Sequence, residues 1–442
     1  MRTLYNILFL LGFVLSSPYY LWRMWRRGNW LHGFGERFAQ YDTKLKQALT
    51  NRQTLWLHAV SVGEVNLCTH LIKALEPRVP NAKMVVSTTT TTGMGELKKR
   101  LPTHVSKIYY PIDRYNYVAR AQAVVHPVAI ILVEAEIWPN FIWRAQSQRT
   151  PLFLVNARIS DRSYRGYKRF GFLFRPLFAA FTGVGAQTEA DAQRLRVLGC
   201  RPEAVRVTGS VKFDAARGTE QRKLDVPALF AQAGAKPDAP ILVCGSTHDG
   251  EEAILGDIFL RLRKQFPNLF LVIVPRHAER TREVERDLKA RGIKYILRSH
   301  LRPDAEKSPS VADCLVVNTT GELKSFYEHA TVVFVGKSLT AQGGQNPIEP
   351  CALGKATVFG PNMQNFADVV SLFLAEQAVA QVKDAAELEQ TLQRLFSDAS
   401  QREQLGLRGL IVVQKNLGAM QRTIEMILSG IKDSGLYIAP PK

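Results

Sequence analysis

Acidic side chains stand directly after two of the apolar runs in this 442-residue chain, where a parallel sheet would present them to a ligand. Glu64 follows the run TLWLHAV and a turn at Gly63. A carboxylate placed there could deprotonate a sugar hydroxyl as a general base. A structural role is equally open, because Ser61 and Glu64 have the S-x-x-E spacing of a helix capping box.

A second acidic pair, Glu134 and Glu136, follows the run VAIILV. If Glu134 ends the strand, the two side chains point the same way and crowd one site. A carboxylate there could stabilise the positive charge that develops on an anomeric carbon as its leaving group departs. The alternative is a solvated turn before Trp138 and Pro139.

Basic and backbone groups that suit phosphate occur later in the chain. Lys212 lies in VTGSVKFD, where it could reach a leaving phosphate, although exposed lysines usually have no such role. Arg276 follows the run LFLVIV and could make a two-pronged contact with phosphate. The segment GSTHDGEE offers Ser246, Thr247 and the N–H groups of a helix start as an anion cradle.

Residues 332–361, VVFVGKSLTAQGGQNPIEPCALGKATVFGP, combine an apolar run, a glycine loop and a helix start. Such a unit presents backbone N–H groups and a positive helix end to phosphates and sugars. Glu349 could accept hydrogen bonds from ribose hydroxyls. The alternative is that Asn346 caps the helix and Glu349 is its favoured first-turn acid.

The elements that would position these residues are short apolar runs alternating with amphipathic stretches, which predicts parallel sheets covered by helices on both faces. We expect an α/β protein with two Rossmann-like, doubly wound domains that bind ligands in the cleft between them. The predicted parts are an anchor (1–30), a first domain (31–215), a linker (216–239), a second domain (240–398) and a helical segment (399–442). The apolar runs are TLWLHAV, KMVVSTTT, KIYYP, VAIILVE, PLFLVN, TGVGAQ and VRVTGS, then ILVCGS, LFLVIVP, IKYILR, DCLVVN, TVVFVG and ATVFGP.

The N-terminal segment reads as a membrane anchor. The residues between Arg2 and Arg23 carry no charge and are numerous enough to span a bilayer as a helix, and more arginines follow at 26 and 27. No cleavage site stands out, which favours an uncleaved anchor with its body on the cytoplasmic side of the membrane. Ser16, Ser17 and Pro18 favour the alternative of a helix lying in one leaflet.

The net charge of +19 calls for an anionic partner, and the anchor makes a membrane surface a simpler one than nucleic acid. Residues 158–170, RISDRSYRGYKRF, mix basic and aromatic side chains and could grip lipid phosphates; a solvated helix face is the alternative. The five cysteines show neither a C-x-x-C pair nor histidines at metal spacing, so we expect reduced thiols and no metal site.

Taken together and in this order, nine motifs resemble the 3-deoxy-D-manno-octulosonic acid (Kdo) transferases of lipopolysaccharide synthesis. The resemblance implies a GT-B architecture, with an N-terminal acceptor domain and a C-terminal donor domain. It also implies an inverting transfer of Kdo from CMP-Kdo to a tetra-acylated lipid A precursor at the inner membrane, without metal or other cofactor. The motifs are HAVSVGE, STTTTTG, VEAEIWPNFI, LVNARIS, VTGSVKFD, GSTHDGEE, VPRH, GELKSFY and GGQNPIEP.

Carried over by motif, Glu64 matches the general base of the family, and Glu134 and Lys212 match the residues that stabilise its transition state. The positions that match the CMP-binding residues are Pro275, Arg276, Gly321, Glu322, Leu323, Asn346, Pro347, Ile348 and Glu349.

One position departs from the family pattern. Gln345 stands where the family commonly has a histidine, and glutamine keeps hydrogen bonding but cannot be protonated. A GT-B enzyme that uses another nucleotide sugar on a membrane lipid is therefore the alternative. A tethered binding protein without catalysis is disfavoured, because Glu64, Glu134 and Lys212 all stand at their motif positions.

Overall fold

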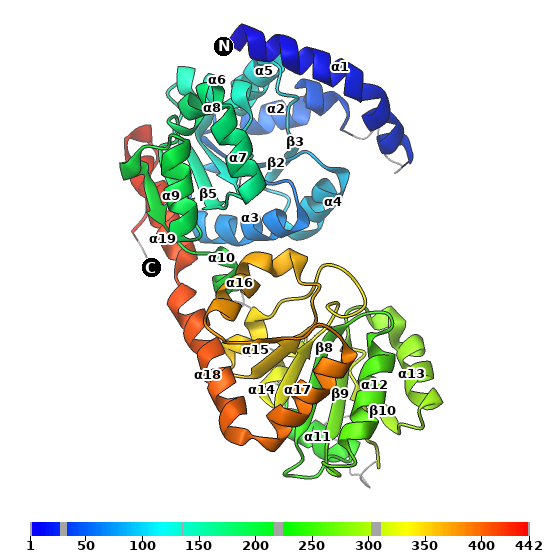
Figure 1. The fold of residues 1–442 in the computed structure, drawn as a ribbon. Helices are drawn as coiled ribbons and strands as arrows, with labels where there is room; N and C mark the ends of the chain where they lie inside the picture. Colours follow the sequence, from blue (N-terminus) through cyan, green and yellow to red (C-terminus); the bar gives the residue numbers. More distant parts are fainter. Residues whose placement is uncertain (1, 27–32, 135, 216–223, 302–310, 441–442) are drawn as a thin grey trace. The chain divides into compact units, whose positions relative to one another are not determined.

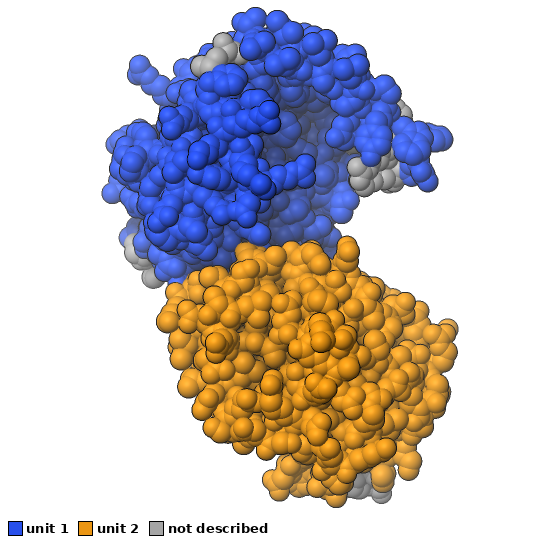
Figure 2. All heavy atoms as spheres, viewed as in Figure 1, with its two compact units in different colours: residues 1–215, 417–442 blue, residues 216–416 orange. Residues whose placement is uncertain are grey.

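The computed structural model describes residues 2–26, 33–134, 136–215, 224–301 and 311–440. The chain forms two compact units, shown in different colours in Figure 2. Unit 1 contains residues 1–215 together with 417–442, and unit 2 contains residues 216–416. Residues 27–32 and 216–223, which include parts of the predicted anchor and linker, lie outside the described residues.

Unit 1 is built on a seven-stranded parallel sheet with the strand order β3-β2-β1-β4-β5-β6-β7. Each strand corresponds to one of the apolar runs of the first half, as predicted. The strands are β1 (Thr54–His58), β2 (Lys83–Thr88), β3 (Ser106–Tyr109), β4 (Pro127–Val133), β5 (Leu152–Ala157), β6 (Gly183–Ala186) and β7 (Val205–Val207).

Helices cover both faces of this sheet because successive side chains of a strand point to opposite faces. Trp56 of β1 packs with the helices of one face, and Leu55 and Leu57 pack with those of the other. The first face carries α5 (Tyr115–Val125), α6 (Pro139–Ser147), α8 (Gly171–Phe178) and α9 (Glu189–Leu198); the second carries α3 (Val62–Leu75), α4 (Thr91–Arg100) and α19 (Ala419–Gly430).

The long helix α1 and several shorter elements complete unit 1, and α1 runs along its outer edge in Figure 1. Among the described residues, α1 is the one helix long and apolar enough to cross a membrane by length and composition. These elements are α1 (Arg2–Arg26), η1 (Gly35–Phe38), α2 (Thr43–Leu49), α7 (Asp161–Arg169), η2 (Pro202–Ala204), α10 (Val211–Ala215) and η6 (Lys432–Ser434).

The C-terminal helix α19 belongs to unit 1, although it follows all of unit 2 in the sequence. Asp214 of α10 accepts hydrogen bonds from the N–H groups of Gly418 (2.7 Å) and Met420 (2.6 Å), at the start of α19. A carboxylate at a helix N-terminus satisfies donors that the helix leaves unpaired. The helical segment predicted at residues 399–442 is thus divided between the two units.

Unit 2 is built on a second seven-stranded parallel sheet, with the order β10-β11-β9-β8-β12-β13-β14. The apolar runs of the second half form β8 to β13, as predicted, and the two-residue β14 was not predicted because it is too short to show a pattern. The strands are β8 (Ile241–Thr247), β9 (Phe270–Pro275), β10 (Tyr295–Leu297), β11 (Cys314–Val316), β12 (Val332–Val335), β13 (Ala356–Phe359) and β14 (Ala380–Gln381).

The helices of unit 2 bury apolar side chains against its sheet, and α12, α13 and α17 contribute to one core together with β8, β9 and β12. The predicted α/β class with two doubly wound parallel sheets is confirmed. The helices are α11 (Val226–Ala233), α12 (Glu251–Leu262), η3 (Ala278–Arg280), α13 (Thr281–Ala290), η4 (Arg298–His300), α14 (Leu323–Glu328), α15 (Ile348–Ala352), η5 (Gln364–Phe366), α16 (Ala367–Ala375), α17 (Ala385–Ser397) and α18 (Ala399–Asn416).

Candidate active site

The strand orders give each sheet a topological switch point, where connections leave two neighbouring strands in opposite directions. In unit 1 the switch point lies between β1 and β4, and in unit 2 between β8 and β12. Ligands of doubly wound sheets bind at the carboxyl ends of the strands at such points. Glu64 and Glu134 follow β1 and β4, and the segments 246–252 and 336–349 follow β8 and β12. These candidate residues of each unit therefore lie where the topology favours a ligand, while others follow β7, β9 and β11.

Glu64 is held at the start of α3 by the predicted capping box. Ser61 Oγ accepts from the Glu64 N–H (3.2 Å), while the Glu64 carboxylate accepts from the N–H groups of Val60 (2.8 Å) and Ser61 (3.3 Å). The side chain is buried, with 8% exposed. A carboxylate accepts about four hydrogen bonds, so these two contacts fix its orientation and leave room for a substrate hydroxyl.

Glu136 lies close enough to Glu64 for the two charges to interact. Burial raises the pKa of Glu136, the Trp138 hydrogen bond opposes the rise, and the Glu64 carboxylate adds to it. Trp138 Nε1 donates to Glu136 Oε2 at 2.8 Å. The sequence singled out this acid only as a neighbour of Glu134, and the structure adds its electrostatic interaction with Glu64.

Glu134 does not continue the strand. β4 ends at Val133, and Glu134 has a φ of 62°, in the left-handed region. Its N–H still reaches Val155 O of β5 at 3.0 Å. The expectation that Glu134 and Glu136 point the same way rested on strand alternation, which does not apply to this turn. Backbone strain in a residue other than glycine is typical of functional sites.

Lys212 lies on α10, which packs against α3, the helix that carries Glu64. The start of α10 is fixed by Asn156 of β5, whose Oδ1 accepts from the Val211 N–H at 3.2 Å. Asn156 is fully buried and has a φ of 52°. This buried asparagine, with its strained backbone, therefore fixes the start of the helix that carries the half-buried Lys212.

In unit 2, charged groups gather after β9, β11 and β12. Burial raises the pKa of Glu349 on α15, while a hydrogen bond from Asn346 and the charges of Lys324 and Arg276 lower it. Arg276 is exposed directly after β9, and Lys324 lies on α14. The structure therefore places Arg276 near enough to Glu349 for their charges to interact, and adds Lys324, which the sequence analysis missed because it follows GEL in an ordinary helix start.

Asn346 has the capping role that was the alternative interpretation of its motif. Its Oδ1 accepts from the Ile348 N–H (3.1 Å) and its Nδ2 donates to Glu349 Oε1 (3.0 Å). Pro347 and Ile348 are buried. The contacts hold the Glu349 carboxylate in place beside the two basic residues, so the capping and ligand-binding interpretations are compatible.

The turn formed by Gly321, Glu322 and Leu323 can present backbone groups to a ligand, because its carboxylate is already hydrogen-bonded within unit 2. Glu322 is 5% exposed and accepts from Arg298 Nη2 (3.2 Å) and Thr319 Oγ1 (2.5 Å) within unit 2. Gly321 has a φ of 84°, and a Cβ there would meet nothing within 4 Å. The glycine is therefore required by the backbone conformation.

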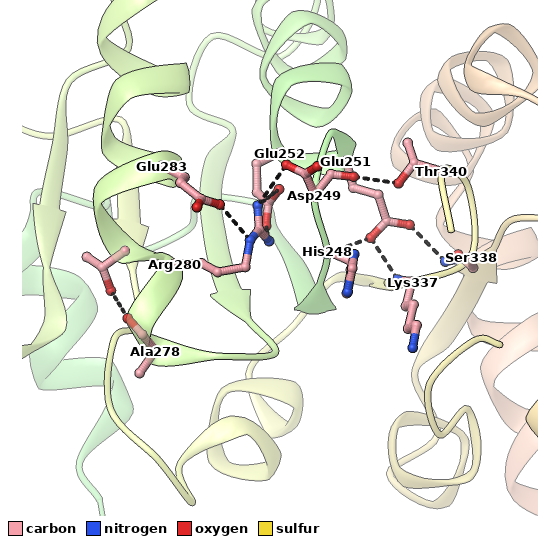
Figure 3. Close-up of polar contacts among 11 residues, drawn as sticks. His248, Asp249, Glu251, Glu252, Ala278, Arg280, Glu283, Lys337, Ser338 and Thr340 are labelled. Atoms are coloured by element: carbon pink, nitrogen blue, oxygen red, sulfur yellow. Dashed lines mark hydrogen bonds and ion pairs between the residues drawn. The ribbon is translucent and has the colours of Figure 1, made fainter. Parts of the chain in front are cut away.

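The segment GSTHDGEE is tied to the loop after β12 by Glu251, as Figure 3 shows. The fully buried Glu251 carboxylate accepts from the N–H groups of His248 (2.9 Å), Lys337 (2.7 Å), Ser338 (2.8 Å) and Leu339 (2.9 Å). The predicted anion cradle included the N–H groups after Thr247. The His248 N–H already donates to Glu251 and is not available to an anion. This part of the expectation is corrected.

The neighbouring Glu252 is neutralised by Arg280, whose Nη1 lies 2.8 Å from Glu252 Oε1 (Figure 3). The two loops also approach closely at Gly336, where a Cβ would lie 2.6 Å from the carbonyl oxygen of Ser246. Glycine is thus required where the carboxyl ends of β8 and β12 meet. Among the residues that the structure describes, no group of three or more His, Cys, Asp or Glu side chains could hold a metal ion.

Comparison with known proteins identifies the family of the chain. The family described as "3-Deoxy-D-manno-octulosonic-acid transferase (kdotransferase)" matches residues 32–215. A 3-deoxy-D-manno-octulosonic acid transferase of Haemophilus influenzae is 32% identical over 378 residues, covering 85% of this chain and 86% of the relative. One of Bordetella pertussis is 31% identical over 426 residues, covering 93% and 96%.

Solved structures share the fold. A putative UDP-N-acetylglucosamine 2-epimerase of Listeria monocytogenes has a TM-score of 0.55 at 13% identity, covering 88% of this chain and all of that one (100%). A glycosyltransferase of Rickettsia africae has a TM-score of 0.52 at 12% identity, covering 87% and 99%.

The two doubly wound units and these relatives define a glycosyltransferase with the GT-B fold. Within that class, the chain belongs to the 3-deoxy-D-manno-octulosonic acid transferase family.

Proposed function

We propose that this enzyme transfers Kdo from CMP-Kdo to a tetra-acylated disaccharide bisphosphate precursor of lipid A, with inversion at the anomeric carbon. The observation that carries the proposal is the placement of charged residues after the strands at and beside the switch point of each sheet. Unit 1 holds a buried carboxylate there, and unit 2 holds a basic pair beside a carboxylate. The identity of the transferred sugar, Kdo, is inferred from the family to which the chain belongs.

Glu64 is the general base. A hydroxyl of the acceptor sugar loses its proton to the Glu64 carboxylate as its oxygen bonds to the anomeric carbon of Kdo, while the bond from that carbon to the CMP oxygen breaks. Attack opposite the leaving group inverts the configuration in one displacement. The N–H groups of Val60 and Ser61 keep the carboxylate oriented for this step. Glu134 and Lys212 stabilise the charges that develop in the transition state.

Unit 2 binds the donor. Arg276 and Lys324 hold phosphate oxygens of CMP, and Glu349 accepts from the ribose hydroxyls. The two basic side chains supply the positive charge that a metal ion would otherwise supply. Backbone groups and neighbouring side chains complete the nucleotide site; they belong to Pro275, Gly321, Glu322, Leu323, Asn346, Pro347 and Ile348.

The basic aromatic segment is the proposed contact for the acceptor phosphates. A groove of about 600 Å³ in unit 1 is lined partly by α7 and α8, with Lys168, Arg169 and Arg175 beside Tyr167 and Phe172. None of the residues of α7 is buried. Cationic groups mixed with aromatic rings suit the phosphates and acyl chains of a lipid. We place the enzyme at the inner membrane with its body in the cytoplasm, and the proposal involves no nucleic acid.

The test is a reaction of the detergent-solubilised enzyme with CMP-Kdo and the tetra-acylated precursor, followed by mass spectrometry. The proposal predicts products heavier by one or more Kdo units. An absence of such products from folded enzyme, with transfer from another nucleotide sugar, would overturn the donor assignment. The variant Gln345→His would then show whether this position selects the donor.

A further inference from the structure

The N-terminal helix α1 is bound to unit 1 through its first turns. Tyr5 Oη donates to Asp113 Oδ2 at 2.8 Å, and Asn140 Nδ2 donates to Asn6 Oδ1 at 2.8 Å. The Tyr5 ring also packs edge-on against Trp143 of α6, with centroids 5.6 Å apart. These contacts fix the amino-terminal end of α1 against the body, and Figure 1 shows this end near α5 and α6.

The chain that follows α1 returns to the same unit. The Tyr109 N–H donates to Glu36 Oε2 at 2.8 Å, and the Ile112 N–H donates to the carbonyl oxygen of Arg37 at 2.8 Å. A helix that crossed a bilayer would hold its two ends about 30 Å apart, on opposite sides of the hydrocarbon. Here the first turns of α1 and the chain that follows it both contact one compact unit, so a crossing would require unit 1 to lie in both compartments.

The face of α1 that points away from unit 1 is apolar. Side chains at helical spacing are exposed along it, including Leu4 (54%), Leu8 (59%), Leu11 (56%) and Leu15 (82%). On the docked face, by contrast, Tyr5, Asn6 and Phe9 are half-buried. A helix with one face on protein and an apolar stripe on the other has the pattern of an interfacial helix.

The two ends of α1 carry features that suit an anionic lipid surface. The helix contains Arg2 and Arg26 and no acidic residue. Its carboxyl-terminal turns expose Tyr19, Tyr20, Trp22 and Trp25, and the Arg26 guanidinium lies 4.9 Å from the centre of the Trp22 ring. Aromatic and arginine side chains are favoured at the boundary between headgroups and acyl chains.

We propose that α1 does not span the membrane but lies along its cytoplasmic surface, with Tyr5 and Asn6 latching it to Asp113 and Asn140 and its leucine face in the lipid. This inference takes the bilayer as partner from the proposed function. The latch reaches toward the catalytic loop, because the Asp113 carboxylate also accepts from the N–H groups of Asn140 (3.0 Å) and Phe141 (2.9 Å) at the start of α6. Helix α6 directly follows the loop that carries Glu134 and Glu136.

The first test is topology. The full chain carries one epitope tag before Met1 and another after Lys442, and protease is added to sealed inside-out inner-membrane vesicles. The proposal predicts that both tags are removed, because both ends lie on the side of the body. Loss of the C-terminal tag with protection of the N-terminal tag would show a spanning helix and overturn the proposal.

The second test is the latch itself. A short bis-maleimide should join the cysteines of the double variant Asn6→Cys and Asn140→Cys in native membranes, since these side chains are in contact. The matched pair Leu15→Cys and Asn140→Cys should not be joined, because Leu15 lies on the exposed face. The five native cysteines are buried free thiols, which limits background. Equal cross-linking of the two pairs, or none of either, would contradict the docked helix.

The third test is the lipid face. Flotation with vesicles of phosphatidylethanolamine and phosphatidylglycerol measures binding of the full chain. Leu8→Glu with Leu11→Glu should weaken binding by at least about tenfold, because each leucine loses its transfer into lipid. Leu407→Glu on α18 is the control, as Leu407 is similarly exposed (55%). Binding unchanged from wild type in the α1 variant would overturn the lipid assignment. None of these readouts uses turnover, so failure of the proposed transfer activity is scored separately.

Discussion

Each unit buries a glutamate at the start of the helix that follows its first strand, but the two carboxylates are held differently. Glu64 of unit 1 accepts from two N–H groups of its own turn. Glu251 of unit 2 accepts from four, three of which come from the loop after β12. Because a carboxylate accepts about four hydrogen bonds, Glu251 is saturated and Glu64 is not.

The same architecture thus gives its two buried glutamates different capacities for a further hydrogen bond. A saturated carboxylate ties two loops together and has no capacity for a substrate, whereas a partly satisfied one is oriented and still able to take a proton. In unit 2, the charges of Arg276 and Lys324 act on a different acid, Glu349, and oppose the rise in its pKa that burial causes.

The largest expected effect is on turnover in unit 1. Glu64→Gln should lower kcat by about 10²- to 10⁴-fold, the usual contribution of a general base, because an amide cannot take the proton. The affinity for CMP, measured by calorimetry, should not change. Glu203→Gln, an exposed acid of the same unit, is the control and should retain wild-type turnover.

The next largest expected effect is a loss of stability in unit 2. Glu251→Gln replaces one acceptor oxygen with a donor and leaves about two buried N–H groups unpaired, which should lower the free energy of unfolding by about 2–5 kcal/mol. Far-UV circular dichroism in denaturant measures the loss. All six tryptophans lie within residues 1–215, so tryptophan fluorescence should report an unchanged transition of unit 1.

The matched control for that measurement is Glu283→Gln, since the Glu283 side chain is 49% exposed and pairs with the same arginine as Glu252. An equal loss of stability in both variants would remove the special role given to the saturated carboxylate.

Asp113 of unit 1 is a third buried carboxylate, and its contribution to stability should depend on pH. Burial raises the pKa of Asp113 from 3.8 to about 6 in the folded state, against the opposing hydrogen bonds of Asn140, Tyr5 and Phe141. Between these values the folded state binds more protons than the unfolded state. The free energy of unfolding of unit 1 should therefore fall as pH rises from 4 to 6, by up to about 3 kcal/mol from this residue.

Denaturation followed by tryptophan fluorescence at several pH values measures this slope. Asp113→Asn should remove its share of the slope, because an amide does not titrate in this range. If wild type and variant keep the same pH dependence, Asp113 does not titrate as assigned.

The smallest expected effect concerns donor binding. Arg276→Ala and Lys324→Ala should each weaken CMP binding by about 10- to 100-fold, the range for a lost hydrogen bond from a charged group. Calorimetry measures the change, and Arg282→Ala, an exposed arginine on α13, serves as control. A normal affinity in Lys324→Ala would limit the basic pair to Arg276.

Much of the fold was predictable because each buried parallel strand leaves a continuous apolar run. The runs predicted β1 to β13, and the capping box at Ser61 was readable from its spacing. The return of α19 to unit 1 was not, since it depends on Asp214 receiving two N–H groups from residues more than 200 positions away.

The position of a candidate residue was predictable where it directly follows a strand, as Arg276 does, or opens the helix after one, as Glu64 does. It was not predictable where the backbone leaves its regular path. The left-handed turn at Glu134 broke the expected alternation with Glu136, and no local pattern indicated that Glu251 collects donors from another loop. The docking of α1 was hidden for the same reason, because hydropathy describes the apolar face and not the partner of Asn6.

The most direct test of the central claim separates the two roles of Glu64 by comparing kcat of Ser61→Ala and Glu64→Gln. Ser61→Ala breaks one bond of the capping box, at a cost of about 1 kcal/mol in stability, and leaves the carboxylate in place. If Glu64 is the base, Ser61→Ala should keep kcat within about a few-fold of wild type, while Glu64→Gln should lose at least about 100-fold. Equal losses in the two variants would show that Glu64 only caps the helix, and would contradict its role as the base.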